Sequence, residues 1–235
     1  MKYSFNSKIR YSEVDKDCRL TLNALTNYFQ DCGVFHSDSV GNGMEYLSEQ
    51  NLAWILSSWQ VYINRMPRIN DNVKISTWAY DMKAFYGYRN FMMETEEGEV
   101  LAYANSIWIL MDVESGRPQK VPEEFGETYG LEPKLDVECH ERKIPVPKDM
   151  EKVGEIVVPS YFIDTNQHMN NEKYIMLAQN VLPEDYEIKE LRVEYKKEAK
   201  LGDLVNIFVK HQDDRVTVLL ADEQEKPYAV VAFLK

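Results

Sequence analysis

The stretch that decides the fold reads Tyr161-Phe-Ile-Asp164-Thr-Asn166-Gln-His168-Met169. A diverged copy near the start of the chain reads Tyr11-Ser-Glu-Val-Asp15-Lys-Asp17-Cys-Arg19-Leu20. At a constant spacing of 149 residues, three polar positions of the two copies match: Asp15 with Asp164, Asp17 with Asn166, and Arg19 with His168. Similarity at a fixed spacing is the signature of a duplicated structural unit.

A second matching pair lies downstream of each copy. Residues 61–75 resemble residues 193–207 at a spacing of 132, with apolar residues coinciding at 61/193, 69/201, 73/205 and 75/207. Within this pair Asp71 falls on Asp203, and Met66 falls on Glu198. Two matches in the same order make chance a poor explanation, so the sequence predicts a tandem repeat.

Each copy predicts one helix followed by several strands. The helical patterns place apolar residues on one stripe, formed by Leu22, Leu25, Phe29 and Cys32 in the first copy and by Tyr174, Leu177, Ala178 and Val181 in the second. Asn170 and Asn171 are candidates for the N-cap of the second helix. The predicted strands are 73–80, 88–94 and 100–111, then 204–210, 216–221 and 228–234.

This plan predicts an α+β fold, a tandem (double) hotdog in which each repeat is a curved antiparallel sheet wrapped around a central helix. We expect an N-terminal repeat at 1–113 and a C-terminal repeat at 153–235. The connector at 114–152 holds five of the nine prolines and many acidic residues, and we expect it to be ordered but irregular.

Composition narrows the function. The net charge of −12 argues against binding nucleic acid or an anionic membrane. Three cysteines without C-x-x-C spacing argue against a disulfide framework and against zinc. No nucleophile elbow, Walker loop or dinucleotide motif is present. The start of the chain shows neither a signal peptide nor a transit segment, and a cytoplasmic location is expected.

Polar side chains gather just before the second helix. If the segment is extended, Asp164, Asn166 and His168 face one side, next to the partly positive helix N-terminus. There His168 could shuttle a proton, Asn166 could bind a carbonyl or a water, and Asp164 could orient the ring or shape the turn. The alternative is an Asx-rich turn with an incidental histidine. A cap could occur in both copies, whereas chemistry is needed in only one.

Glu198 stands where the first copy has Met66, so the register favours an inward-facing carboxylate. Such a position is costly unless the charge is used or paired, which makes Glu198 a candidate general base. The alternative is a surface glutamate beside the three lysines Lys196, Lys197 and Lys200. Whether Glu198 or Asp164 is the base stays open.

Four stretches, residues 11–25, 108–122, 164–174 and 193–203, resemble the acyl-acyl-carrier-protein (acyl-ACP) thioesterases of plant plastids and some bacteria. The Asn-Gln-His-Met-Asn-Asn run is the most specific of them. The resemblance implies hydrolysis of fatty acyl-ACP to free fatty acid, which ends chain elongation, with acyl carrier protein as partner and no metal or organic cofactor. It also implies that the first repeat shapes the acyl pocket and that the second carries the chemistry.

By position, the family's catalytic residues fall on Asp164, Asn166, His168 and Glu198. Plant members often have cysteine after that glutamate, whereas this chain has Ala199. A thiol mechanism at that position is therefore excluded, and attack by water without a covalent intermediate is expected. The missing transit segment fits a bacterial-type member.

Several alternatives stay open at this stage. The same fold could serve an acyl-CoA thioesterase, a hotdog hydratase or a non-catalytic acyl-thioester binding module. Neither nucleic acid nor stable membrane association is expected, and a homodimer is possible. The sequence does not predict the preferred acyl chain length.

Overall fold

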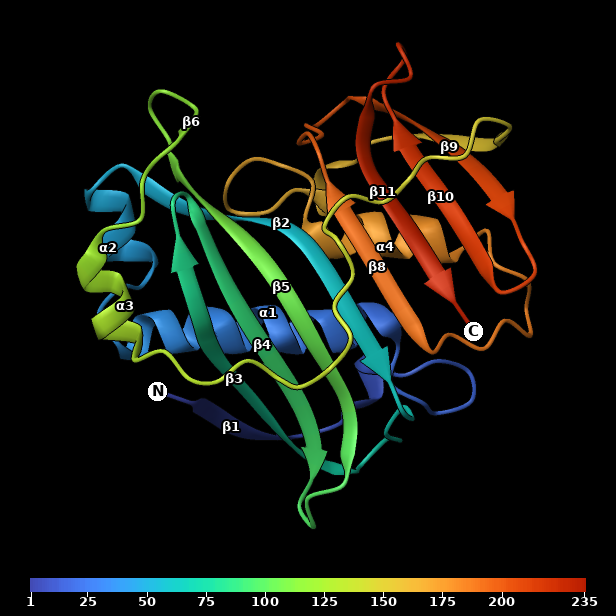
Figure 1. Ribbon diagram of the computed structural model, residues 1–235. Coiled ribbons are helices and arrows are strands. Elements are labelled where there is room, and N and C mark those ends of the chain that lie inside the picture. Colours follow the sequence, from blue (N-terminus) through green and yellow to red (C-terminus); the bar gives the residue numbers. More distant parts are fainter. The chain divides into compact units, whose positions relative to one another are not determined.

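The computed structural model describes all 235 residues, and the chain divides into two compact units (Figure 1). The first unit comprises Met1–Ser57 and Val61–Cys139, and the second comprises Ser58–Gln60 and His140–Lys235. Each unit contains one copy of the repeated sequence. The tandem hotdog predicted from the sequence is confirmed.

The first unit is a sheet packed on a long helix. Its strands are β1 (Tyr3–Lys8), β2 (Leu52–Ile63), β3 (Asn72–Lys83), β4 (Tyr86–Thr95) and β5 (Val100–Asp112), in the order β1-β3-β4-β5-β2. The pairs β1–β3, β3–β4 and β4–β5 are antiparallel. A two-residue strand, β6 (Arg117–Pro118), pairs with β5.

The second unit repeats this plan with shorter elements. Its strands are β7 (Glu151–Val157), β8 (Glu190–Tyr195), β9 (Leu204–His211), β10 (Arg215–Ala221) and β11 (Pro227–Leu234). They are antiparallel in the order β8-β11-β10-β9-β7. The six predicted strands are thus confirmed, whereas β1, β2, β6, β7 and β8 were not predicted.

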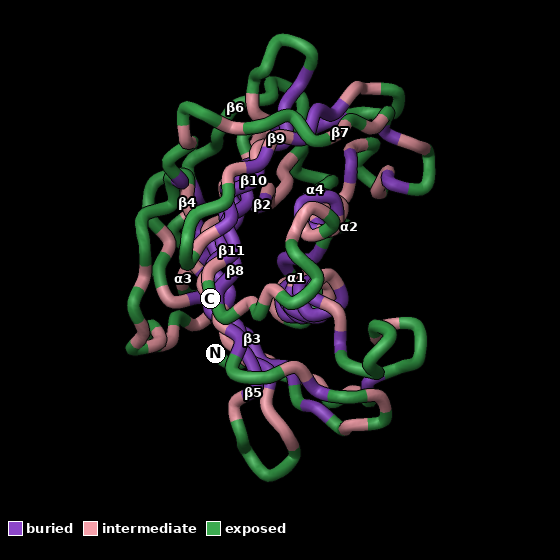
Figure 2. Tube along the Cα trace, turned by 90° about the vertical axis from the view of Figure 1, so that its right-hand side faces the viewer, coloured by how far each residue is buried: buried purple, intermediate pink, exposed green.

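The central helices are α1 (Leu22–Ser39) and α4 (Asn171–Gln179), and each packs against its own sheet. Thr21 caps α1 by accepting a hydrogen bond from the N–H of Ala24, and Asn170 caps α4 by accepting one from the N–H of Glu172. The predicted apolar stripes are buried (Figure 2), except that Val181 lies beyond the end of α4. The prediction of Val181 as a stripe residue is therefore wrong, because the helix ends at Gln179.

Additional elements pack against each sheet. In the first unit α2 (Met44–Glu49) and α3 (Glu123–Tyr129) join one apolar cluster, formed by Leu47, Ala79, Leu110, Val121, Phe125 and Tyr129. In the second unit Ile144 packs on Val230 and Ala232 of β11. The connector, expected to be irregular, thus supplies one short helix and one apolar contact. None of the helices has the length and apolar character needed to cross a membrane.

Candidate active site

The segment before α4 is a tight turn built by Asp164. Its Oδ1 accepts hydrogen bonds from the backbone N–H groups of Asn166, at 2.8 Å, and of His168, at 3.3 Å. The N–H of Asp164 donates to the carbonyl of His168 at 2.8 Å, and Gln167 adopts a positive φ of 64°. The segment is therefore not extended, the condition under which the three side chains would face one side, because the carboxylate folds the chain back on itself.

The first copy contains the same turn. Asp15 Oδ1 accepts from the N–H of Asp17 at 2.8 Å and from that of Arg19 at 3.0 Å. The N–H of Asp15 donates to the carbonyl of Arg19 at 2.8 Å, and Cys18 has a φ of 60°. The turn alone thus accounts for the aspartate in both copies, and it leaves the side chain of residue 19 or 168 free to differ.

A second loop is tied to each turn by one backbone hydrogen bond. In the first copy the N–H of Leu20 donates to the carbonyl of Pro67, and in the second the N–H of Met169 donates to that of Ala199, both at 2.8 Å. Since Glu198 precedes Ala199, this bond brings the glutamate beside the turn. The two repeated motifs, which match at spacings of 149 and 132 residues, are therefore in contact within each unit.

The structure brings His168 and Glu198 together. The Nε2 atom of His168 lies 3.2 Å from Oε2 of Glu198. The side chains are 26% and 47% exposed, respectively. The inward-facing position predicted for Glu198 is therefore wrong, because its loop leaves the carboxylate half in solvent. The result is a carboxylate–imidazole pair that water can reach.

Asn166 is placed differently from the other candidates. It is exposed, its backbone N–H is held by Asp164, and no hydrogen bond joins its side chain to His168 or Glu198. Its amide is therefore free to meet a ligand or water. His168 precedes the N-cap of α4 by two residues, so the imidazole lies close in sequence to the partly positive helix end.

One residue beside this pair was missed in the sequence, where Tyr174 was assigned only to the buried stripe. Its Oη accepts a hydrogen bond from the N–H of Ala199 at 2.9 Å. Burial raises the pKa of Tyr174, and the negative charges of Glu198 and Asp164 raise it further, so the phenol stays neutral. The signal was present in the repeat, because Ala199 stands opposite Pro67, which has no N–H.

The chemistry open to this group of residues is proton transfer. A carboxylate and an imidazole at hydrogen-bond distance can take a proton from water and deliver one to a leaving group. No group of three or more histidine, cysteine, aspartate or glutamate side chains is arranged to hold a metal ion.

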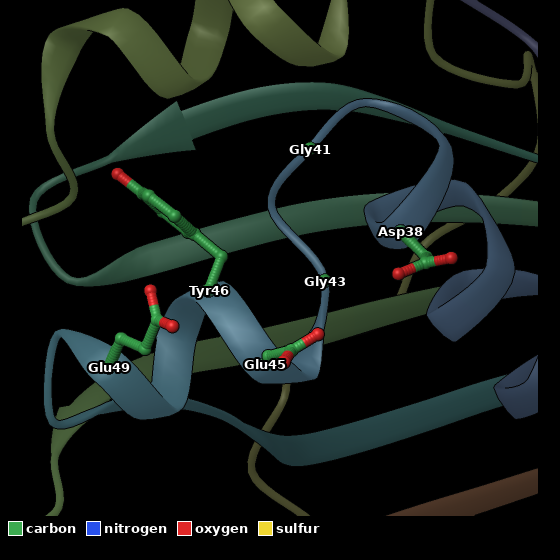
Figure 3. A pocket seen from close by; sticks show the side chains of 6 residues that line it. All are labelled: Asp38, Gly41, Gly43, Glu45, Tyr46 and Glu49. Atoms are coloured by element: carbon green, nitrogen blue, oxygen red, sulfur yellow. The ribbon is translucent and has the colours of Figure 1, made fainter.

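A hollow in the first unit offers no comparable chemistry. It lies around α2 and carries three carboxylates without a histidine or a cysteine (Figure 3), and its lining residues are Asp38, Gly41, Gly43, Glu45, Tyr46 and Glu49. An acidic, open surface of this kind does not suit an apolar chain. The pair formed by His168 and Glu198 therefore stays the best candidate.

Two family models match the chain in tandem. Residues 1–129 match the model described as the acyl-ACP thioesterase N-terminal domain, and residues 147–229 match that of the acyl-ACP thioesterase C-terminal domain. The chain is 28% identical over 212 residues to a chloroplastic palmitoyl-acyl carrier protein thioesterase of Cuphea hookeriana, covering 83% of this chain and 51% of that protein. It is 29% identical over 214 residues to a protein of the same description from Gossypium hirsutum, covering 84% and 52%.

Solved structures share the whole fold. A crystal structure of an acyl-ACP thioesterase from Bacteroides thetaiotaomicron matches with a TM-score of 0.91 and 21% identity, covering 99% of this chain and 97% of that one. The 12:0-ACP thioesterase from Umbellularia californica matches with a TM-score of 0.87 and 20% identity, covering 99% and 96%. The chain spans about half the length of the curated relatives it matches.

Proposed function

Because the chain belongs to the acyl-ACP thioesterase family, we propose that it hydrolyses fatty acyl-ACP thioesters to free fatty acid and carrier protein. On this proposal the reaction ends fatty-acid chain elongation. The observation that carries it is the 3.2 Å contact between His168 Nε2 and Glu198 Oε2. The first copy, with Arg19 and Met66 at the corresponding positions, has no such pair.

In the proposed mechanism, Glu198 removes a proton from a water molecule as that water attacks the thioester carbonyl. The tetrahedral intermediate carries its negative charge on oxygen, where Asn166 and the N-terminus of α4 can stabilise it. The proton taken by Glu198 passes to His168 across their contact, and His168 gives a proton to the departing sulfur as the carbon–sulfur bond breaks. The products are a carboxylic acid and the thiol of the carrier, so no covalent enzyme intermediate is needed.

The turn geometry supports Glu198 over Asp164 as the base. Oδ1 of Asp164 already accepts two backbone hydrogen bonds, as Oδ1 of Asp15 does in the other copy. These two hydrogen bonds hold the oxygen in the turn, so it is less available to a water molecule. Glu198 is half exposed and accepts no backbone hydrogen bond, so its carboxylate is free to meet water. Ala199 offers no thiol for a covalent route.

Two further parts of the proposal concern the rest of the chain. The first unit would shape the pocket for the acyl chain, which its longer helix and larger sheet support. A cytoplasmic location is supported by the three free cysteines, which suit a reducing compartment. The net charge of −12 supports the absence of stable association with anionic membranes.

The decisive experiment supplies purified protein with acyl-ACP of several chain lengths and follows free fatty acid by mass spectrometry. The same acyl groups on coenzyme A, and an enoyl-ACP, serve as competing substrates. We expect a higher kcat/KM with acyl-ACP than with acyl-CoA, and no hydration of the enoyl chain. Hydrolysis of acyl-CoA alone, or hydration without hydrolysis, would contradict the proposal. Release of no product from any thioester would leave only a binding module.

A further inference from the structure

The hydroxyl of Tyr174 contacts the backbone next to Glu198. Tyr174 lies on α4 with 2% of its surface exposed, and Ala199 is fully buried. The N–H of Ala199 belongs to the peptide bond that joins Glu198 to Ala199, and it donates to Oη of Tyr174 at 2.9 Å. A buried N–H needs an acceptor, because leaving it unpaired costs free energy. Tyr174 is the acceptor that this peptide bond has.

The first copy has neither the donor nor the acceptor of this hydrogen bond. At the same spacings the residue matching Tyr174 is Leu25, and the residue matching Ala199 is Pro67. Both are buried, and proline has no N–H that would need an acceptor. The hydroxyl and the N–H therefore occur together, and they occur in the copy that carries Glu198.

Ala199 is held from two directions. Its N–H is bound by Tyr174 on α4, and its carbonyl accepts the N–H of Met169, the residue after His168. The first bond fixes the peptide on the Glu198 side, and the second fixes the distance to the turn. Without the first bond the peptide between Glu198 and Ala199 can rotate, and the carboxylate can leave the imidazole.

We propose that Tyr174 is a positioning residue, whose hydroxyl holds the Glu198–Ala199 peptide so that the Glu198 carboxylate stays against His168. The proposal rests on the thioesterase function proposed above. It assigns Tyr174 no contact with the substrate. Loss of the hydroxyl should therefore slow the chemical step and leave substrate binding almost unchanged.

The first test is Tyr174→Phe, with Tyr195→Phe as matched control. Tyr195 is a neighbouring, partly buried tyrosine whose hydroxyl donates to the carbonyl of Asn171 at 3.0 Å, so the control also loses one hydrogen bond. We expect kcat of Tyr174→Phe to fall about 10- to 100-fold with KM within about twofold, because misplacing a catalytic group by an ångström has effects of this size. Tyr195→Phe should keep kcat within about threefold. A normal kcat in Tyr174→Phe, or an equal loss in both variants, overturns the proposal.

The second test introduces the proline that the first copy has at this position. Ala199→Pro removes the N–H, so it is combined with Tyr174→Phe in a double-mutant cycle. We expect the double variant to have a higher kcat than Tyr174→Phe, because no unpaired N–H remains. Losses that simply multiply would overturn the proposal.

A third readout does not depend on activity. Amide hydrogen exchange at Ala199, measured in the 15N-labelled protein, should be faster in Tyr174→Phe than in the wild type and Tyr195→Phe. Unchanged exchange at Ala199 would overturn the hydrogen bond itself. If the wild type hydrolyses no thioester, the proposed function fails, and the exchange result still decides whether Tyr174 holds this peptide.

Discussion

The turns at residues 15–19 and 164–168 share one backbone and differ in their side chains. In both, an aspartate oxygen accepts two backbone N–H groups, and the residue three positions after the aspartate has a positive φ. In both, the residue after the turn donates to the second loop at 2.8 Å. Yet one turn presents Arg19 and the other presents His168. The backbone conformation of the turn therefore does not depend on which of these side chains it presents.

The comparison also separates three of the four candidate residues into two groups. Asp164 has a counterpart that makes the same hydrogen bonds, so its structure needs no catalytic explanation. His168 and Glu198 have counterparts of different chemical type, Arg19 and Met66, so the turn does not explain them. Differences between the copies, rather than similarities, point to the chemistry.

The largest expected effect concerns the paired side chains. His168→Ala and Glu198→Gln should each lower kcat/KM by about 10²–10⁴, the usual range for acid–base groups. Arg19→Ala, the matched change in the first turn, should leave kcat/KM within about threefold. The measurement is steady-state hydrolysis of acyl-ACP by each folded variant. Full activity in either His168→Ala or Glu198→Gln would show that the wrong residues have been chosen.

Replacing either aspartate should lower the stability of the protein by a similar amount. Replacing Asp164 should affect activity less than replacing His168 or Glu198. Asp164→Ala and Asp15→Ala each remove an acceptor of two backbone N–H groups, so each should lower the free energy of unfolding by about 1–2 kcal/mol. Asp164→Asn keeps an oxygen acceptor and should lose less than about tenfold in kcat. Urea unfolding and steady-state kinetics give both quantities. If Asp164→Asn were as inactive as Glu198→Gln, Asp164 would be the base instead.

Most of this comparison could be predicted from the two spacings at which the copies match in sequence. Because the spacing of 149 and the spacing of 132 each align backbone hydrogen bonds as well as residue types, the meeting of Met169 with Ala199 follows from that of Leu20 with Pro67. Given the contact in the first copy, the two spacings place Glu198 close to His168 in the second copy. The helix cap at Asn170 was equally readable.

Two features of the site could not be predicted from the sequence, each for a physical reason. The positive φ at Gln167 and Cys18 falls on residues other than glycine, so no residue type marks the turn. The 47% exposure of the Glu198 side chain was missed because the matching residue, Met66, also lies in a loop, where the register of the repeat does not fix the direction of a side chain. The exposure of a loop carboxylate depends on where the loop ends, which periodicity does not encode.

The central helices differ as much as the turns are alike. α1 has 18 residues and α4 has nine, and the extra half of α1 carries the fully buried His36. His36 Nδ1 lies 2.8 Å from Nη1 of Arg89, a buried cation. By strand register Arg89, opposite Ala79, corresponds to Val216, opposite His211. The first unit therefore contains a buried polar pair where the second has an apolar residue.

This difference predicts that acid destabilises the protein through His36. Burial, followed by the positive charges of Arg89 and of the amino terminus, lowers the pKa of His36 to about 3 from an ordinary value near 6.5. The unfolded chain then binds the extra proton, so stability is complete above pH 6.5 and falls as the pH drops towards 3. Between pH 7 and 5.5 this residue should account for about 1 kcal/mol of lost stability.

His36→Gln is the matched control for that loss, because glutamine keeps an acceptor for Arg89 and does not titrate. Urea unfolding of the wild type and His36→Gln at both pH values isolates the contribution of the histidine. The variant should lose less stability than the wild type over this interval. Equal losses would show that His36 is already protonated in the folded unit.

The smallest effect is expected at Ala199, the residue after Glu198. The side chain of Ala199 is fully buried beneath its loop, and its peptide is bound by Tyr174 and Met169. A thiol introduced there would be buried, which disfavours the thiolate that a nucleophile requires. Ala199→Cys should therefore change kcat by less than about threefold and leave the enzyme insensitive to iodoacetamide. A large gain in rate, abolished by alkylation, would mean that this loop opens far enough for covalent chemistry and that the water mechanism holds only for the alanine form.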